Sequence, residues 1–125
     1  MSASGWIGVD LDGTLAEYHG WNGGVIGKPV PAMVERVKQW LSDGVTVKIM
    51  TARVSLFGGY SSESNRTADT QFADEQTKLI QEWCIEHIGA KLEVTYCKDF
   101  TMIELWDDRA VQIIPNTGKR ADGRE

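Results

Sequence analysis

Acidic side chains follow a short apolar run near the start of the sequence. The run from Trp6 to Val9 leads into Asp10 and Asp12, with Gly13 and Thr14 directly after them. Residues two apart in extended backbone point to the same side, so the two carboxylates would lie together. They would repel each other unless a cation or a shared proton offset their charge. An Asx-type turn, in which the carboxylates accept backbone N–H bonds, is the structural alternative for this segment alone.

Three later segments carry polar side chains that suit the same chemistry. They follow the next apolar runs: Thr51, Ala52 and Arg53 after the second, Lys98 after the third, and Asp107 and Asp108 after the fourth. Mg²⁺ prefers one or two carboxylates, water and a substrate phosphate oxygen. A carboxylate can also be the nucleophile that splits phosphoryl transfer into two easier steps, with nearby cations stabilising the transferring oxygens. The residue types therefore predict a metal-and-phosphate site.

Each of these residues also has a structural alternative. A threonine can cap a strand end, a lysine is usually solvated, and neighbouring aspartates are common in turns. Arg53 and Arg109 are expected to pair with nearby acids more often than to contact substrate. Trp21 and Tyr60 are expected to pack or to belong to a loop rather than to stack on a base. The functional interpretation requires that the separate segments meet at one place in the fold.

Strands and helices are predicted to alternate along the chain. One helix is expected to open at Pro29 and Pro31 and to stop at Gly44, and another to cover about residues 70–87. Strands are predicted over about 6–10, 45–50, 92–96 and 102–106, with a short fifth strand over 111–114. This order predicts a three-layer, Rossmann-like α/β fold with a central, mainly parallel sheet and helices on both faces. Ligands bind outside the carboxyl ends of such strands, where the polar residues occur.

Two internal segments lack this periodicity. Residues 16–28, here called the flap, are rich in glycine and aromatic residues, and we expect them to lie over the end of the first strand in a hairpin-like arrangement. Residues 54–69 are polar and are predicted to form a long loop. Residues 116–125 are small and charged and are predicted to be a flexible tail, which leaves residues 1–115 as one domain.

Composition restricts the classes of function. The 125 residues are 42% hydrophobic and 25% charged, with a net charge of −5, which predicts no broad nucleic-acid-binding surface. No apolar run is long enough to cross a membrane, and we expect no export signal at the N-terminus. Cys84 and Cys97 are expected to be reduced and buried, as in a cytoplasmic protein.

The polar segments resemble the motifs of a known enzyme family. The run from Asp10 to Leu15, Asp-Leu-Asp-Gly-Thr-Leu, is similar to the first motif, DxDGT, of the haloacid dehalogenase-like hydrolase superfamily. Thr51 resembles its second motif, Lys98 its third, and Asp107 with Asp108 its fourth, in the same order along residues 6–114. The segment 106–110 also resembles small bacterial and phage members that contain a similar strand–DDRA run.

The resemblance implies a role for each matching residue. Asp10 would be the phosphorylated nucleophile and a Mg²⁺ ligand, and Asp12 the general acid/base with its backbone carbonyl on the metal. Thr51 would bind the phosphoryl group, Lys98 would hold that group and Asp10, and Asp107 or Asp108 would complete the metal shell. The neighbouring residues expected to contact phosphate or substrate are Gly13, Thr14, Ala52 and Arg53.

Larger relatives carry a cap domain that shapes the substrate pocket, whereas this chain offers only the flap and the 54–69 loop. We therefore expect a nearly capless, Mg²⁺-dependent phosphatase that acts on a phosphomonoester through an aspartyl-phosphate. Its substrate would be a small molecule, a nucleotide or the 3′ or 5′ end of a nucleic acid, with no membrane partner. The alternative of another class is a non-catalytic metal- or phosphate-binding regulatory module, although such a module would not need both Asp10 and Asp12. The oligomeric state stays open.

Overall fold

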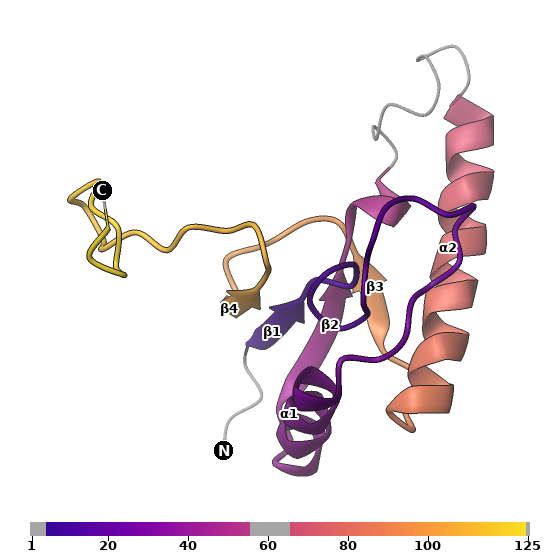
Figure 1. Cartoon of the computed structure of the whole chain (residues 1–125), viewed down its shortest axis with the longest axis horizontal. Helices are drawn as coiled ribbons and strands as arrows, with labels where there is room; N and C mark the ends of the chain where they lie inside the picture. Colours follow the sequence, from indigo (N-terminus) through magenta and orange to yellow (C-terminus); the bar gives the residue numbers. More distant parts are fainter. Residues whose placement is uncertain (1–4, 56–65, 125) are drawn as a thin grey trace.

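The computed structural model describes residues 5–55 and 66–124, and within this part the chain forms a parallel sheet with two main helices (Figure 1). The elements in chain order are β1 (Trp6–Val9), α1 (Pro31–Ser42), β2 (Thr46–Met50), the 3₁₀ turn η1 (Ala52–Val54), α2 (Arg66–His87), β3 (Glu93–Thr95) and β4 (Met102–Trp106). Tyr60 and most of the predicted 54–69 loop lie outside the described residues.

The four strands are all parallel and lie in the order β3-β2-β1-β4. β1 is therefore central, and all four of its residues are buried, as expected for a strand flanked on both edges. The ladder continues past two strand ends, because Asp10 donates its N–H to the Trp106 carbonyl at 2.9 Å and Thr51 donates to the Thr95 carbonyl at 2.9 Å. The carboxyl ends of β1, β2, β3 and β4 thus meet at one edge.

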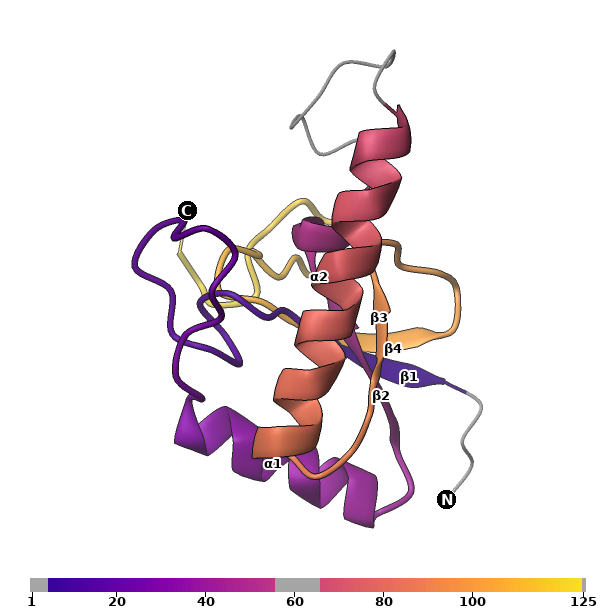
Figure 2. The ribbon, with the colours of Figure 1, turned by 90° about the vertical axis from the view of Figure 1, so that its right-hand side faces the viewer.

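Both helices pack on the same face of this sheet. Ile7 and Val9 of β1 lie opposite Val47 and Ile49 of β2, and these residues form one buried cluster with side chains from α1 and α2. Figure 2 shows the two helices on one side of the strands. Each step from β1 to β2 to β3 moves in the same direction across the sheet, so right-handed crossovers bring both helices to one face.

The prediction of helices on both faces is therefore wrong for the described residues. The connection from β3 to β4 spans only residues 96–101 and contains no helix. On the other face, Lys48 lies over the Trp6 ring, 4.6 Å from its centroid, and forms a 3.4 Å ion pair with Glu93. A polar cover of this kind lets one face of the sheet meet solvent.

Several predicted boundaries also need correction. α2 begins at Arg66 rather than near residue 70, and β3 is shorter than expected. The predicted strand 111–114 is not part of the sheet: Ile113 makes only an isolated bridge with Arg120, in a segment that leads away from the strands (Figure 1). Cys84 is buried as predicted, but Cys97 is exposed. Among the described residues, no helix has both the length and the apolar character needed to cross a membrane.

The flap starts from a tight turn that is anchored in the core. Leu11 and Leu15 are fully buried, and the Leu11 carbonyl accepts bonds from the N–H groups of Leu15 and Ala16 at 3.0 and 2.9 Å. At the base of the flap, Glu17 donates to the Lys28 carbonyl at 2.8 Å, beside an antiparallel bridge between Ala16 and Pro29. This pairing agrees with the predicted hairpin-like entry into the flap.

Candidate active site

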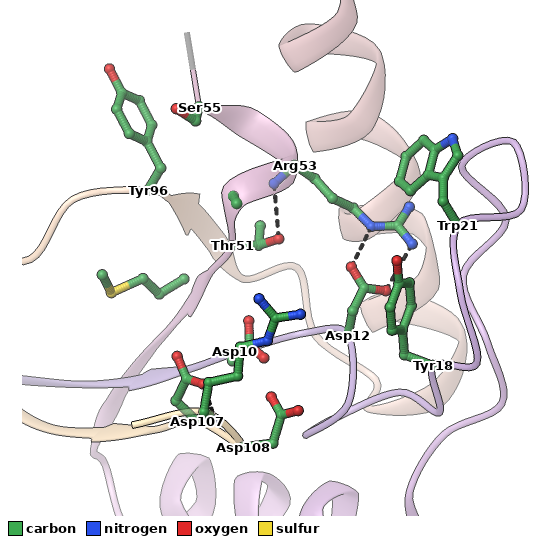
Figure 3. Close-up of a pocket in the computed structure, with 13 residues that line it drawn as sticks. Asp10, Asp12, Tyr18, Trp21, Thr51, Arg53, Ser55, Tyr96, Asp107 and Asp108 are labelled. Atoms are coloured by element: carbon green, nitrogen blue, oxygen red, sulfur yellow. Dashed lines mark hydrogen bonds and ion pairs between the residues drawn. The ribbon is translucent and has the colours of Figure 1, made fainter. Parts of the chain in front are cut away.

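The carboxyl edge of the sheet is hollowed into a pocket of about 560 Å³ (Figure 3). Residues from all four strand ends and from the flap line it: Asp10, Asp12, Tyr18, Trp21, Met50, Thr51, Ala52, Arg53, Ser55, Tyr96, Asp107, Asp108 and Arg109. The volume is within the range of small-molecule sites. Seven of the ten residues that the sequence predicts for the site line this pocket.

Three aspartates form a carboxylate cluster in the pocket. Asp10 follows β1, Asp107 and Asp108 follow β4, and one oxygen from each lies within 4.8 Å of the others. These strands are adjacent, which is why residues almost a hundred positions apart meet. The Thr14 hydroxyl bridges two of the acids, 3.4 Å from Asp10 Oδ2 and 3.3 Å from Asp108 Oδ1. Since a hydroxyl has one hydrogen, it donates to one carboxylate at a time.

The cluster raises the pKa of Asp10 from its ordinary 3.8 to about 7. Burial of the carboxyl group is the largest cause, followed by a hydrogen bond with Asp108, which requires a proton. The negative charges of Asp107, Asp108 and Asp12 raise it further. The site therefore holds more negative charge than its own side chains compensate, and a proton or a bound cation would relieve it.

Gly13 allows the first motif to approach the fourth. Its backbone has φ of +91°, which disfavours any residue with a Cβ, and a Cβ placed there would lie 2.6 Å from Asp108 Oδ2. Gly13 and Thr14 do not line the pocket themselves. Their contacts are with the aspartates, so they support the carboxylate cluster from behind rather than facing a ligand.

Asp12 points away from the cluster and toward Arg53. The guanidinium binds both carboxylate oxygens, Nε to Oδ2 at 2.7 Å and Nη2 to Oδ1 at 2.8 Å (Figure 3). Asp12 is thus absent from the group of three that could hold a metal through side chains. Such a fork uses two of the roughly four lone-pair positions of a carboxylate, so Asp12 keeps acceptor capacity toward the pocket.

Arg53 does not fit the predicted role of a phosphate contact in this arrangement. Only 4% of it is exposed, and its five N–H groups all have protein acceptors: the two Asp12 oxygens, Gln76 Oε1, and the Gly24 and Val25 carbonyls. No donor is left for a substrate oxygen. The contacts of Arg53 agree with the other expectation from the sequence, that it pairs with a nearby acid.

Thr51 lies between Arg53 and the carboxylate cluster, at the end of β2. Its side chain is buried, and its hydroxyl oxygen accepts the Arg53 N–H at 3.1 Å, which caps η1. The hydroxyl hydrogen is still available to donate to an anion. Both the structural and the functional alternatives for Thr51 thus remain compatible with its position.

Lys98 is exposed, three residues beyond the end of β3, and does not line the pocket. Its predicted contact with Asp10 is not among the interactions of the described residues. Tyr96 from the same segment is among the lining residues instead. Arg109, which follows the paired aspartates, is the lining cation that is not committed to Asp12.

Sequence reasoning missed several lining residues: Tyr18, Met50, Ser55 and Tyr96, with Trp21 and Arg109 considered only as structural residues. Their shared signal is position, since each lies in the flap or within a few residues of a strand end. The tip of the flap (residues 21–25) reaches the site because Trp21 stacks on the Arg53 guanidinium, 5.0 Å from the ring centroid. That packing has no signature in the local sequence.

Comparison with known proteins supports the fold. No family model matches the chain, and no curated protein matches it significantly. One similar solved structure is that of a conserved protein coded by a locus of Bacteroides thetaiotaomicron, with 22% sequence identity and a TM-score of 0.51. The match covers 88% of this chain and 80% of that one. The likeness places the chain among α/β folds with a central parallel sheet.

Proposed function

We propose that this chain is a Mg²⁺-dependent phosphatase, a small member of the haloacid dehalogenase-like superfamily that hydrolyses a phosphomonoester through an aspartyl-phosphate on Asp10. One observation carries the proposal: Asp10, which is far from Asp107 and Asp108 in sequence, forms a carboxylate cluster with them at the carboxyl edge of a parallel sheet, in a pocket that Thr51 also lines. The residues that resemble the first, second and fourth motifs therefore line one pocket, whereas Lys98, which resembles the third, does not. An isolated DxD turn would not need the two later aspartates.

The donor set fits a Mg²⁺ ion. Three carboxylate oxygens lie within 4.8 Å of one another, and burial, the hydrogen bond with Asp108 and the charges of the neighbouring aspartates together raise the pKa of Asp10. Mg²⁺ selects hard oxygen ligands of this kind and usually keeps several waters. Asp10, Asp107 and Asp108 would hold it, and a bound ion would neutralise charge on the transferring phosphoryl oxygens.

The residues divide the reaction into two steps. A carboxylate oxygen of Asp10 attacks phosphorus, the bond to the leaving oxygen breaks, and Asp12 gives that oxygen its proton. Water then attacks the phosphorus of the aspartyl-phosphate and gives a proton to Asp12, which releases phosphate and restores Asp10. Thr51 can donate its hydroxyl hydrogen to a phosphoryl oxygen in both steps.

The walls of the pocket favour a phosphoester with a planar group. Tyr18, Trp21 and Tyr96 line the pocket from the flap and from the end of β3. Aromatic side chains bind flat ligands by stacking, and bases stack on them regardless of sequence. Because Trp21 already stacks on Arg53, Tyr18 and Tyr96 are the lining rings that would serve here. Nucleotides and phosphorylated nucleic-acid ends are therefore the second set of substrates to examine, and the acidic net charge favours the smaller of the two.

Hydrolysis of p-nitrophenyl phosphate tests the proposal. We expect turnover with Mg²⁺, none with EDTA, and at least about a 10³-fold loss in Asp10→Asn, because that amide cannot act as the nucleophile. Asp74→Asn is the matched control, since Asp74 is an exposed aspartate on α2 outside the pocket. Absence of turnover in a wild-type protein that still binds Mg²⁺ would favour a non-catalytic module, and nucleotides would then be screened as binding partners.

A further inference from the structure

Arg53 connects three parts of the molecule that are distant in sequence. It follows β2, and its guanidinium bonds Asp12 after β1, the Gly24 carbonyl in the flap and Gln76 Oε1 in α2, at distances between 2.7 and 2.9 Å. A fifth bond, to the Val25 carbonyl, is longer at 3.4 Å. A lysine at this position could not make the same set of hydrogen bonds, because an ammonium is a point charge without a planar fork of donors.

The flap depends on Arg53 at its tip but not at its base. The base is closed by backbone pairing of Glu17 with Lys28, and Trp83 Nε1 donates to the Gly27 carbonyl at 3.1 Å. At the tip, Arg53 supplies the bonds to Gly24 and Val25 and the cation for the Trp21 ring. The Trp21 ring also packs against Phe72 of α2, with ring centroids 6.2 Å apart. Loss of the guanidinium would therefore loosen the tip without releasing it, while the base stayed paired.

Stability alone does not explain a buried arginine here. A buried ion pair is expensive to desolvate and is often no more stabilising than apolar residues of similar size. The fork does provide a fixed direction for the Asp12 carboxylate, whose two remaining acceptor positions are left for a ligand. Its position next to the carboxylate cluster makes geometric control the better account.

We propose that Arg53 is a positioning residue that orients Asp12 for proton transfer and, with the same guanidinium, holds the flap over the pocket. The part of this proposal that concerns proton transfer rests on the proposed phosphatase function. The part that concerns the flap does not. A closed flap and an oriented acid would then occur together, so that the site is complete only when the tip is in place.

Arg53→Lys tests both parts, with Arg120→Lys as the matched control. Arg120 makes the same forked contact with an aspartate, Asp122, at 3.1 and 3.0 Å, but it lies in the C-terminal segment outside the pocket. We expect kcat for p-nitrophenyl phosphate to fall about 10²-fold in Arg53→Lys with KM within about threefold, because misplacement of a reacting group costs this much. Arg120→Lys should match the wild type.

The dependence on leaving group separates positioning from general damage. Phenyl phosphate has a more basic leaving oxygen than p-nitrophenyl phosphate and needs the proton from Asp12 more. The loss in Arg53→Lys should therefore be about tenfold larger on phenyl phosphate. In an Asp12→Asn background, Arg53→Lys should cost less than about threefold further, because residues that act as a unit are not additive. Equal losses on the two substrates, or additive losses in the double variant, would overturn the proton-transfer role.

Amide exchange of the flap tests the second part without any turnover. The Val25 N–H lies at the tip and donates to the Asn22 carbonyl at 3.1 Å, while the Val30 N–H just beyond the base donates to the Leu15 carbonyl at 2.8 Å. We expect exchange at Val25 to rise about tenfold in Arg53→Lys and that at Val30 to stay unchanged. Unchanged exchange at Val25 would refute the proposal that Arg53 holds the flap. An inactive wild type would refute the phosphatase function instead, and the exchange data would still test whether Arg53 holds the flap.

Discussion

Replacement of Asp10 by asparagine should stabilise the metal-free protein at alkaline pH. The folded state raises the pKa of Asp10 from 3.8 to about 7, a difference of about three pH units. Each unit corresponds to about 1.4 kcal/mol, which gives a ceiling of about 4 kcal/mol for the destabilisation caused by the ionised carboxylate. Asp10 is partly exposed, so solvent screening reduces this, and we expect about 2 kcal/mol.

The sign of the pH dependence follows from the direction of this change. The folded state binds the Asp10 proton more tightly than the unfolded state, so the associated stability is fully present below about pH 4. It is lost as the pH rises through about 7. Asparagine stays neutral throughout, and the advantage of Asp10→Asn over the wild type should therefore be largest at pH 8 and fall by more than half at pH 5.

Thermal unfolding in EDTA measures this difference. For a domain of this size, about 2 kcal/mol corresponds to roughly 8 °C in Tm, so Asp10→Asn should melt that much higher at pH 8. Asp74→Asn, which removes an exposed charge outside the pocket, should change Tm by less than about 2 °C at either pH. If Asp10→Asn melted at or below the wild type at pH 8, the carboxylates would not be crowded as described, and the argument for a cation would fail.

Three further outcomes follow from the same contacts. Mg²⁺ at about 100 times its Kd should stabilise the wild type by about 2.7 kcal/mol by mass action, and Asp108→Asn should lose most of this in calorimetric titration and in Tm. Gly13→Ala should cost about 1–3 kcal/mol in denaturant unfolding and weaken Mg²⁺ binding, because its Cβ would strike Asp108. Gly20→Ala, which has a positive φ but open space around it, should show the backbone cost without the loss of Mg²⁺ binding. Hydrogen bonds from Thr101 and then Trp6 lower the pKa of Asp99 to about 2, so Asp99→Asn should destabilise the protein at pH 7, with the difference from the wild type lost as the pH falls through about 2.

Local sequence determined the elements and the candidate chemistry. Apolar runs marked the two inner strands, β1 and β2, alternating residues marked β3, and helical periodicity marked α1 and α2. Because the carboxyl ends of parallel strands lie at one edge, the sequence alone predicts that the polar residues after them share one site. The carboxylate cluster of Asp10, Asp107 and Asp108 follows from this rule.

Only the tertiary structure decided how these groups pair. The order of the strands places both helices on one face, because it depends on the direction of each crossover and not on any local pattern. In the same packing, Asp12 pairs with Arg53 instead of joining the carboxylate cluster. The other acceptors of Arg53 come from the flap and α2. Lys98, which the family resemblance implied would hold Asp10, is exposed and does not line the pocket. Sequence fixes the residue types that reach an edge, whereas side-chain partners depend on distances between segments that meet only after the chain has folded.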